Sequence, residues 1–453
     1  SKDMAGISNI GAEAQKVNSV KAEKDGIEKE AFFCTTKELS RLGLEQIPTQ
    51  FQSHKHLIYS SPATLAFNSP GAEGFGVKRA GLAVPDSIML IVAPGCCGRN
   101  TSLISSMKEY NDRFYYLMMD ETDIVTGRHL KKIPKAVEEI CSVCPKKPSV
   151  VMICITCVDA LLGTDMERVC KKAEEQVEIP VRPCYMYALT REGRKPPMVH
   201  VRQSLYSLLE PGKKKGNVVN LLGFFSPLVD DCEIYDLLHS AGVKTIHEIS
   251  RCKDYMEYQT MSEANFNLVL HHEARFAAED FHNRLQIPFI ELRRLYQIDK
   301  IENQYHALGN ALGVAFYDEK YKKQAEDALE KFRQRCPDAS FAIGECLNAD
   351  PFELSLALIR YGFSVPEIYG TITVENFTYI RSLAKISPET KVFSNMEPTM
   401  IYYDPAKSDV NLAIGKDACY YHPDCPYVMW NGEEQPYGYA GVRRLFEQLL
   451  EVV

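Results

Sequence analysis

The chain has 453 residues, which is enough for about two to four domains at the usual ~100–200 residues each. Its net charge of −8 argues against nucleic acid as the main partner. No apolar run approaches the ~18 residues that a transmembrane helix needs, and the first residues lack the pattern of a secretory signal. We therefore expect a soluble, cytoplasmic protein that binds neither a membrane nor nucleic acid.

From residue 87 onward, short apolar runs alternate with amphipathic stretches. Apolar runs at 87–93, 115–119 and 149–155 predict buried strands, and helical patterns separate them. Alternating β and α units of this size predict a parallel sheet. Gly242 and Gly362 each follow a predicted helix and precede a strand, so we predict that they cap corresponding helices.

The whole pattern predicts an α/β protein with three Rossmann-like, doubly wound domains and mainly parallel sheets. The Gly- and Lys-rich segment 210–216 separates the first two domains. The predicted parts are an N-terminal arm and entry helix, three domains, and a C-terminal segment that packs on the first domain: 1–59, 60–212, 217–300, 301–425 and 426–453.

The 15 cysteines are odd in number and irregular in spacing, which does not favour a disulfide framework. Cys141 and Cys144, with Cys154 and Cys157, are spaced like two halves of a zinc ribbon. The gap between the pairs is short, however, and alternation along a strand directs Cys154 and Cys157 to opposite faces. We therefore interpret Cys141, Cys144 and Cys154 as core residues.

Cys96, Cys97 and Cys157 stand in turns that directly follow predicted strands. The carboxyl ends of parallel strands are where open α/β sheets bind ligands. Thiolates are soft anionic donors that suit iron–sulfur clusters, and the glycines beside Cys96 and Cys97 permit close backbone approach. Either Cys96 or Cys97 could be the primary ligand; the alternative is that these are structural thiols. The turn lacks the spacing of a phosphate-binding loop, so we expect no ATP hydrolysis by this chain alone.

Three further groups are candidate sites. His271, His272 and Arg275 stand at the start of a predicted helix, where anions are favoured, and predict a cofactor pocket; surface histidines are the alternative. Trp430, the only tryptophan, is a further pocket candidate or a packing residue. The third group comprises Cys419, His422 and Cys425, which could bind a metal; a metal-free surface loop is the alternative.

Several segments, in order, resemble the nitrogenase component 1 family, which includes cofactor-assembly scaffold subunits and dark-operative protochlorophyllide reductase subunits. The resemblance runs from about residue 60 to the end. The segments that carry it are Leu65–Ala72, Pro94–Gly98, Glu121-x-Asp123-x-Val125-x-Gly127, Thr156-Cys157 with Leu162–Asp165, Asn217–Gly223 and Gln286–Ile290.

This resemblance implies pairing with a homologous or identical subunit, in a dimer or tetramer. It also implies an iron–sulfur cluster of four or more irons, shared between subunits and bound by Cys96 and Cys157, with Cys97 or Cys34 as the substitute for the family's third cysteine. An ATP-dependent iron protein would dock there and supply electrons, and the complex would need anaerobic handling. The family's first cysteine falls near Leu65, and the ligands of the active-site metallocofactor fall near Leu270 and Val428. Because none of these residues can bind metal, we expect no iron–molybdenum cofactor.

Three functions are therefore open. The first is a reductase subunit that relays electrons through the shared cluster to a substrate between its domains. The second is a scaffold or carrier that holds a metallocluster without turnover. The third is a cluster-free partner subunit.

Overall fold

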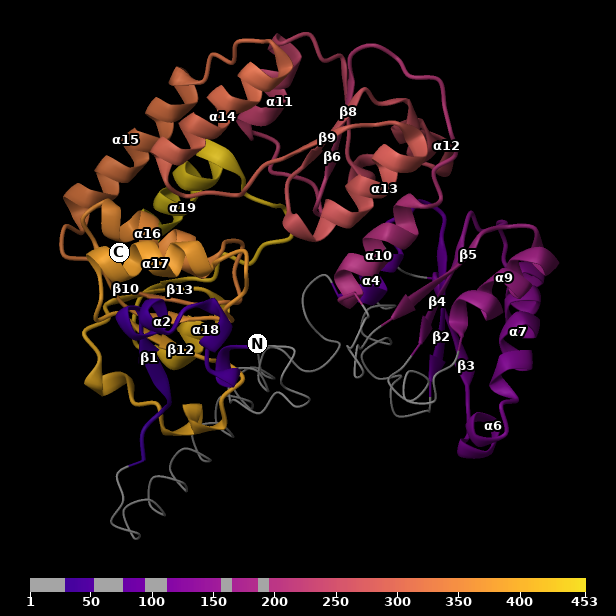
Figure 1. Cartoon of the computed structure of the whole chain (residues 1–453), viewed down its shortest axis with the longest axis horizontal. Helices are drawn as coiled ribbons and strands as arrows, with labels where there is room; N and C mark the ends of the chain where they lie inside the picture. Colours follow the sequence, from indigo (N-terminus) through magenta and orange to yellow (C-terminus); the bar gives the residue numbers. More distant parts are fainter. Residues whose placement is uncertain (1–28, 53–75, 94–111, 156–164, 186–194) are drawn as a thin grey trace. The chain divides into compact units, whose positions relative to one another are not determined.

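The computed structural model describes residues 29–52, 76–93, 112–155, 165–185 and 195–453 (Figure 1). The chain forms two compact units. Unit 1 comprises residues 1–73, 228–241 and 294–453, and unit 2 comprises residues 74–227 and 242–293. Among the described residues, none of the helices combines the length and apolar character needed to cross a membrane.

Unit 2 contains two four-stranded parallel sheets. The strand order of the first sheet is β3-β2-β4-β5, and the bounds are β2 Ile88–Ala93, β3 Phe114–Met118, β4 Val151–Ile155 and β5 Val181–Tyr185. The order of the second sheet is β7-β6-β8-β9, and the bounds are β6 Val218–Leu222, β7 Thr245–His247, β8 Phe266–Val269 and β9 Phe289–Glu291. The helices of this unit are α4 Val77–Gly81, α6 Glu121–Val125, α7 His129–Val143, α9 Met166–Val177, α10 Pro197–Tyr206, α12 Tyr255–Gln259 and α13 Arg275–Leu285.

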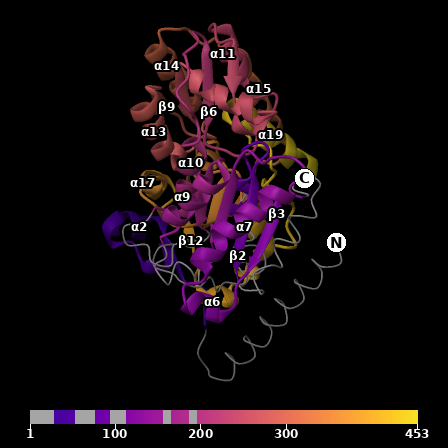
Figure 2. The ribbon, with the colours of Figure 1, turned by 90° about the vertical axis from the view of Figure 1, so that its right-hand side faces the viewer.

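Strand β2 is buried on both faces because helices cover both sides of its sheet. Leu90 belongs to a core that includes residues of α7 and α9, and Figure 2 shows α7 over β2 and β3. Met89 and Ile91 belong to a second core that includes residues of α4, α10 and α13. Successive side chains of a strand point to opposite faces, so an uninterrupted apolar run is the sequence of a strand covered on both sides.

Unit 1 contains a six-stranded sheet in the order β1-β12-β11-β10-β13-β14. All of its pairs are parallel except β1 with β12. The strands are β1 Phe33–Thr35, β10 Ser340–Ile343, β11 Ser364–Tyr369, β12 Lys391–Phe393, β13 Leu412–Ile414 and β14 Tyr427–Val428. The helices are α2 Thr36–Leu42, α11 Glu233–Ser240, α14 Ile298–Leu312, α15 Glu319–Arg335, α16 Pro351–Arg360, α17 Phe377–Ile386, α18 Lys416–Tyr421 and α19 Gly438–Val452.

The C-terminal helix α19 packs along α15 and also contacts α11 and α14 (Figure 1). No side chain of its own caps its first turn. The buried carboxylate of Glu233, on α11, instead accepts hydrogen bonds from the backbone N–H groups of Tyr439 and Ala440. Gly438, with φ of +61°, must be glycine, because a Cβ there would overlap the Glu233 carboxylate.

The α/β fold class with mainly parallel sheets is confirmed. The predicted cap positions are also confirmed, because Gly242 and Gly362 have φ of +100° and +99° just beyond α11 and α16. Cys154 is fully buried and Cys141 and Cys144 pack against the core, as predicted. The domain boundaries, and the packing of 426–453 on 60–212, stay predictions.

Candidate functional site

The strands that precede the predicted cluster cysteines are neighbours. β2 and β4 pair in parallel, with Val92 opposite Ile155, so both end at the same edge of the sheet. Cys96, Cys97 and Cys157 follow these ends along the sequence but lie outside the described residues, as does Leu65. Within the described residues, no group of three or more His, Cys, Asp and Glu side chains is arranged to hold a metal ion. Ligation by these three cysteines therefore stays a prediction.

Asp123 is a buried carboxylate on α6, the short helix that follows β3, and β3 is the other neighbour of β2. Its backbone N–H donates to Asp120 Oδ1 at 2.7 Å, and Lys132 Nζ donates to its Oδ1 at 2.8 Å. The hydrogen bond from Lys132 holds the pKa of Asp123 below its usual value. An ionised carboxylate on α6 is thus tied to α7 through Lys132, in the segment where the sequence carries the Glu-x-Asp-x-Val-x-Gly pattern.

The second sheet of unit 2 brings two chain segments very close at its carboxyl edge. The Leu270 N–H donates to Leu222 O at 2.7 Å, which extends the β6–β8 pairing by one step. Gly223, with φ of +144°, follows directly, and a Cβ there would lie only 2.8 Å from His271 N. Glycine is therefore required at residue 223 for His271 to stand beside the end of β6.

His271 and His272 form a small aromatic group at this edge. Their rings stack at 4.5 Å between centroids, and the Phe224 ring meets His271 edge-on at 5.7 Å. His271 Nδ1 accepts a hydrogen bond from the Glu273 N–H at 3.1 Å, which orients the ring. The two histidines that the sequence predicted as a pair are therefore brought together.

Arg202, on α10, places a buried positive charge beneath the same edge. Its Nε donates to Gly223 O at 3.1 Å and its Nη1 to Met198 O at 2.8 Å, and the guanidinium lies 4.6 Å from the Phe225 ring centroid. Its Nη1 is 3.8 Å from the Glu273 carboxylate. Sequence reasoning missed Arg202, because its main partner is a backbone carbonyl that no side-chain pattern reveals.

The other two residues of the predicted pocket have structural contacts. Arg275 makes a two-pronged ion pair with Glu291 on β9, through Nε and Nη2 at 2.8 Å each. Trp430 belongs to unit 1, where it is 6% exposed and its Nε1 donates to Tyr296 Oη at 2.8 Å. A role for Arg275 and Trp430 in cofactor binding stays a prediction.

His422, of the Cys419/His422/Cys425 group, is buried in a hydrogen-bonded cluster on one face of the unit 1 sheet. Its Nε2 lies 2.7 Å from Tyr403 Oη and 3.0 Å from Glu367 Oε2. Cys425 Sγ contacts Val410 O at 3.5 Å, and burial raises the pKa of the Cys419 thiol. The ring nitrogen that could bind a metal therefore faces a carboxylate and phenols. Glu367, a carboxylate within the otherwise largely apolar strand β11, was a sequence signal of this cluster that we overlooked.

Comparison with known proteins identifies the family. The sequence model of the nitrogenase component 1 type oxidoreductases matches residues 73–453. The chain belongs to this family. It is 25% identical over 418 residues to the nitrogenase iron-molybdenum cofactor biosynthesis protein NifE of Sinorhizobium fredii, covering 86% of this chain and 82% of that protein. It is 24% identical over 418 residues to NifE of Mesorhizobium japonicum, with the same coverage.

A solved structure of nitrogenase Cp1 at pH 6.5 has the same fold. It superimposes with a TM-score of 0.68 at 19% identity, covering 90% of this chain and 96% of that chain. The resemblance to the nitrogenase component 1 family that the sequence motifs indicated is thereby confirmed.

Proposed function

We propose that the chain is a scaffold subunit that holds an iron–sulfur metallocluster during cofactor assembly. The observation that carries this proposal is the similarity to NifE, a cofactor biosynthesis protein, over four fifths of both chains. In this proposal the cluster is cargo that is built and passed on, and the subunit is not itself a nitrogenase.

Cys96, Cys157 and either Cys97 or a thiol of the second subunit are the proposed ligands of a four-iron or larger cluster. Thiolates are the donors that such clusters require. The shared edge of β2 and β4 supports this assignment, because the sequence leads from both strand ends into cysteine-bearing segments. The second subunit would be a homologous or identical chain.

The edge formed by β6 and β8 is the proposed docking place for the cargo. Buried Arg202 contributes positive charge there, and His271 and His272 contribute ring nitrogens. Clusters rich in sulfide and thiolate are anionic, so a cation and N–H donors favour them. Leu270 and Val428 are buried aliphatic residues that offer no metal ligand, so we expect no permanently bound iron–molybdenum cofactor.

A reductase subunit is the second candidate, because the family itself is described as oxidoreductase. In that case an ATP-dependent iron protein would deliver electrons through the cluster to a substrate. The two candidates differ in the fate of the iron: a scaffold gives its cluster up to an acceptor, whereas a reductase keeps it through turnover.

The first experiment measures iron and acid-labile sulfide in the anaerobically purified chain, co-expressed with its genomic neighbours. We expect iron in the wild type and loss of most of it in Cys96→Ala and Cys157→Ala. Cys336→Ala, a half-buried free cysteine outside the proposed site, is the matched control and should keep its iron. A wild type without iron would contradict both candidates and leave the cluster-free partner subunit.

The second experiment mixes the iron-loaded chain with apo-ferredoxin and separates the two proteins. A scaffold transfers iron to the acceptor without added ATP or reductant. Retention of all iron, together with ATP-dependent oxidation of the reductant when the iron protein is added, would favour the reductase.

A further inference from the structure

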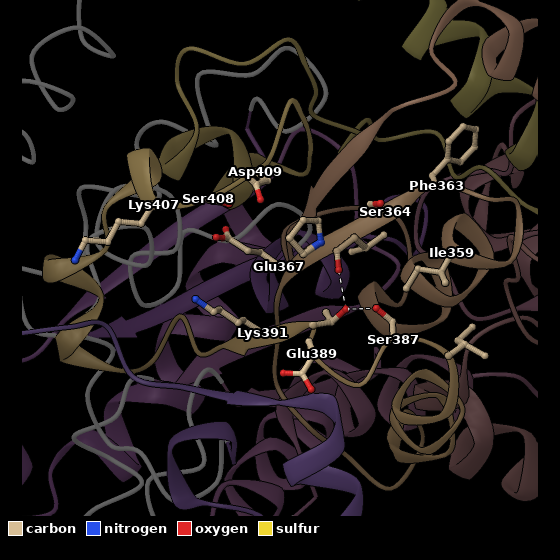
Figure 3. A pocket seen from close by; sticks show the side chains of 14 residues that line it. Ile359, Phe363, Ser364, Glu367, Ser387, Glu389, Lys391, Lys407, Ser408 and Asp409 are labelled. Carbon is tan, nitrogen blue, oxygen red and sulfur yellow. Dashed lines mark hydrogen bonds between the residues drawn. The ribbon is translucent and has the colours of Figure 1, made fainter.

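Unit 1 contains a cavity of about 430 Å³ that has no part in the proposed cluster chemistry (Figure 3). It is lined by the first residues of β11, by the turn that leads into β12, and by the loop at residues 407–409. Small-molecule sites in proteins have volumes of about 300–1,000 Å³. This cavity therefore has the size of a site for a small metabolite.

Glu367 of β11 lines the cavity although it is only 4% exposed. Tyr369 Oη donates to its Oε2 at 2.9 Å, and His422 Nε2 lies 3.0 Å from the same oxygen. Tyr403 Oη also donates to Oε2. Burial alone would raise the pKa of Glu367, but the hydrogen bonds from His422 and Tyr403 outweigh it and hold that pKa below its ordinary value. The cavity thus has a buried, ionised carboxylate in its wall.

The hydrogen bonds of Glu367 leave one of its oxygens available. All three donors converge on Oε2, and Oε1 takes none of these bonds. The buried Ser408 hydroxyl lies near the carboxylate and helps to lower its pKa, but no hydrogen bond of ordinary geometry engages its Oγ. A buried charge with incomplete hydrogen bonding is costly, which favours a ligand that donates to it.

The remaining lining adds charges of both signs and a hydrocarbon surface, so the buried Glu367 carboxylate sets the charge of the ligand. Glu389 and Asp409 add two carboxylates, and Lys391 and Lys407 add two ammonium groups, of which that of Lys391 lies 4.7 Å from the centroid of the Phe33 ring. The apolar part of the lining is contributed by Ile359, Phe363, Val365, Pro366 and Ile386. An anionic ligand would meet the buried Glu367 carboxylate, and a fully polar one would leave these apolar side chains without contacts.

We propose that this cavity binds a small aliphatic amine, whose ammonium group donates to Glu367 Oε1 and whose alkyl chain contacts the apolar lining. An ammonium has three N–H donors and no acceptor, so it matches an oxygen that lacks donors. Hydrogen bonds between ionised partners are about twice as strong as neutral ones. The proposal stands apart from the cluster site, since none of the lining residues belongs to unit 2.

The test is calorimetric titration of the purified full-length chain with butylammonium chloride, and with 1-butanol as the uncharged match. We expect saturable binding of butylammonium and binding of butanol weaker by roughly tenfold or more, the value of one good charged hydrogen bond. Glu367→Gln should weaken butylammonium binding by a similar factor. Glu389→Gln is the matched control, because Glu389 lines the cavity but is exposed. The affinity of this variant for butylammonium should stay within about twofold of the wild-type value.

A second variant covers the possibility that Glu367→Gln does not fold. Ser364, at the exposed start of β11, also lines the cavity, so Ser364→Phe should block it without touching Glu367 or its partners. Loss of butylammonium binding in Ser364→Phe, with unchanged thermal stability, supports the proposal. No saturable binding, equal affinity for butanol, or an equal loss in Glu389→Gln would overturn it.

Discussion

The carboxylate of Glu233 replaces the cap that α19 lacks, and its removal has a calculable effect. Glu233 Oε1 accepts hydrogen bonds from the Tyr439 N–H at 2.6 Å and from the Tyr305 hydroxyl at 2.7 Å, and Oε2 accepts one from the Ala440 N–H at 3.1 Å. The first N–H groups of a helix have no partner inside the helix. Glu233→Ala would therefore leave three buried donors without an acceptor.

We expect Glu233→Ala to lower the free energy of unfolding of unit 1 by about 3 kcal/mol. Each buried donor left without a partner costs about 1–3 kcal/mol. Burial also raises the pKa of Glu233, so removing the carboxylate relieves a desolvation cost that offsets part of this loss. The expected loss of unfolding free energy is therefore near the low end of the range obtained by adding the costs of the three donors.

Urea unfolding followed by tryptophan fluorescence measures this effect, because Trp430 is the only tryptophan and lies in unit 1. Tyr305→Phe is the matched control: it removes one donor and keeps the carboxylate, so it should cost about 1 kcal/mol. A loss below about 1 kcal/mol for Glu233→Ala, or equal losses in the two variants, would refute the capping role.

Three further predictions concern other buried contacts. Gly223→Ala should destabilise unit 2 by about 1–3 kcal/mol, because its Cβ would press on the backbone of the neighbouring β8 segment; an unchanged melting temperature would contradict this. Gly344→Ala should cost unit 1 about 3 kcal/mol, since its Cβ would overlap a buried carboxylate, whereas Gly432→Ala, which has open space, should be nearly neutral. Burial raises the pKa of Glu353 from 4.5 to about 7, so below about pH 7 the folded chain holds a proton on this carboxyl more tightly than the unfolded chain does. The stability that this protonation contributes is lost as the pH rises through about 7. Relative to Glu353→Gln, the wild type should therefore lose up to about 3 kcal/mol between pH 4.5 and pH 8, and a pH-independent difference between their melting temperatures would show that the carboxyl keeps an ordinary pKa.

Sequence patterns predicted the strands whose burial is visible in their own residues. Strands β2 and β4 were predicted because both faces are buried, which produces uninterrupted apolar runs. Strand β1 was not predicted, because it has three residues and its partner β12 lies more than 350 positions away in the chain. A short strand that depends on so distant a partner leaves no local trace in the sequence.

The candidate site divides in the same way. His271 and His272 are adjacent in the sequence, so their proximity needed no fold to be seen. Arg202 and Gly223 could not be connected in advance, because a guanidinium bound to a backbone carbonyl depends on how α10 packs beside β6. The partners of Glu367 could not be connected in advance for a similar reason. They are Tyr369, Tyr403 and His422, which lie in three separate parts of the chain.

Residues 228–241, including α11, belong to unit 1, although the strands before and after them, β6 and β7, belong to unit 2. The polypeptide therefore passes between the units four times, at residues 73, 227, 241 and 293. Both termini belong to unit 1, so deleting either of them would leave unit 1 incomplete, and a protease that cut one crossing would release neither unit. Excising a single unit for study would require at least one new artificial junction that rejoins its separated pieces.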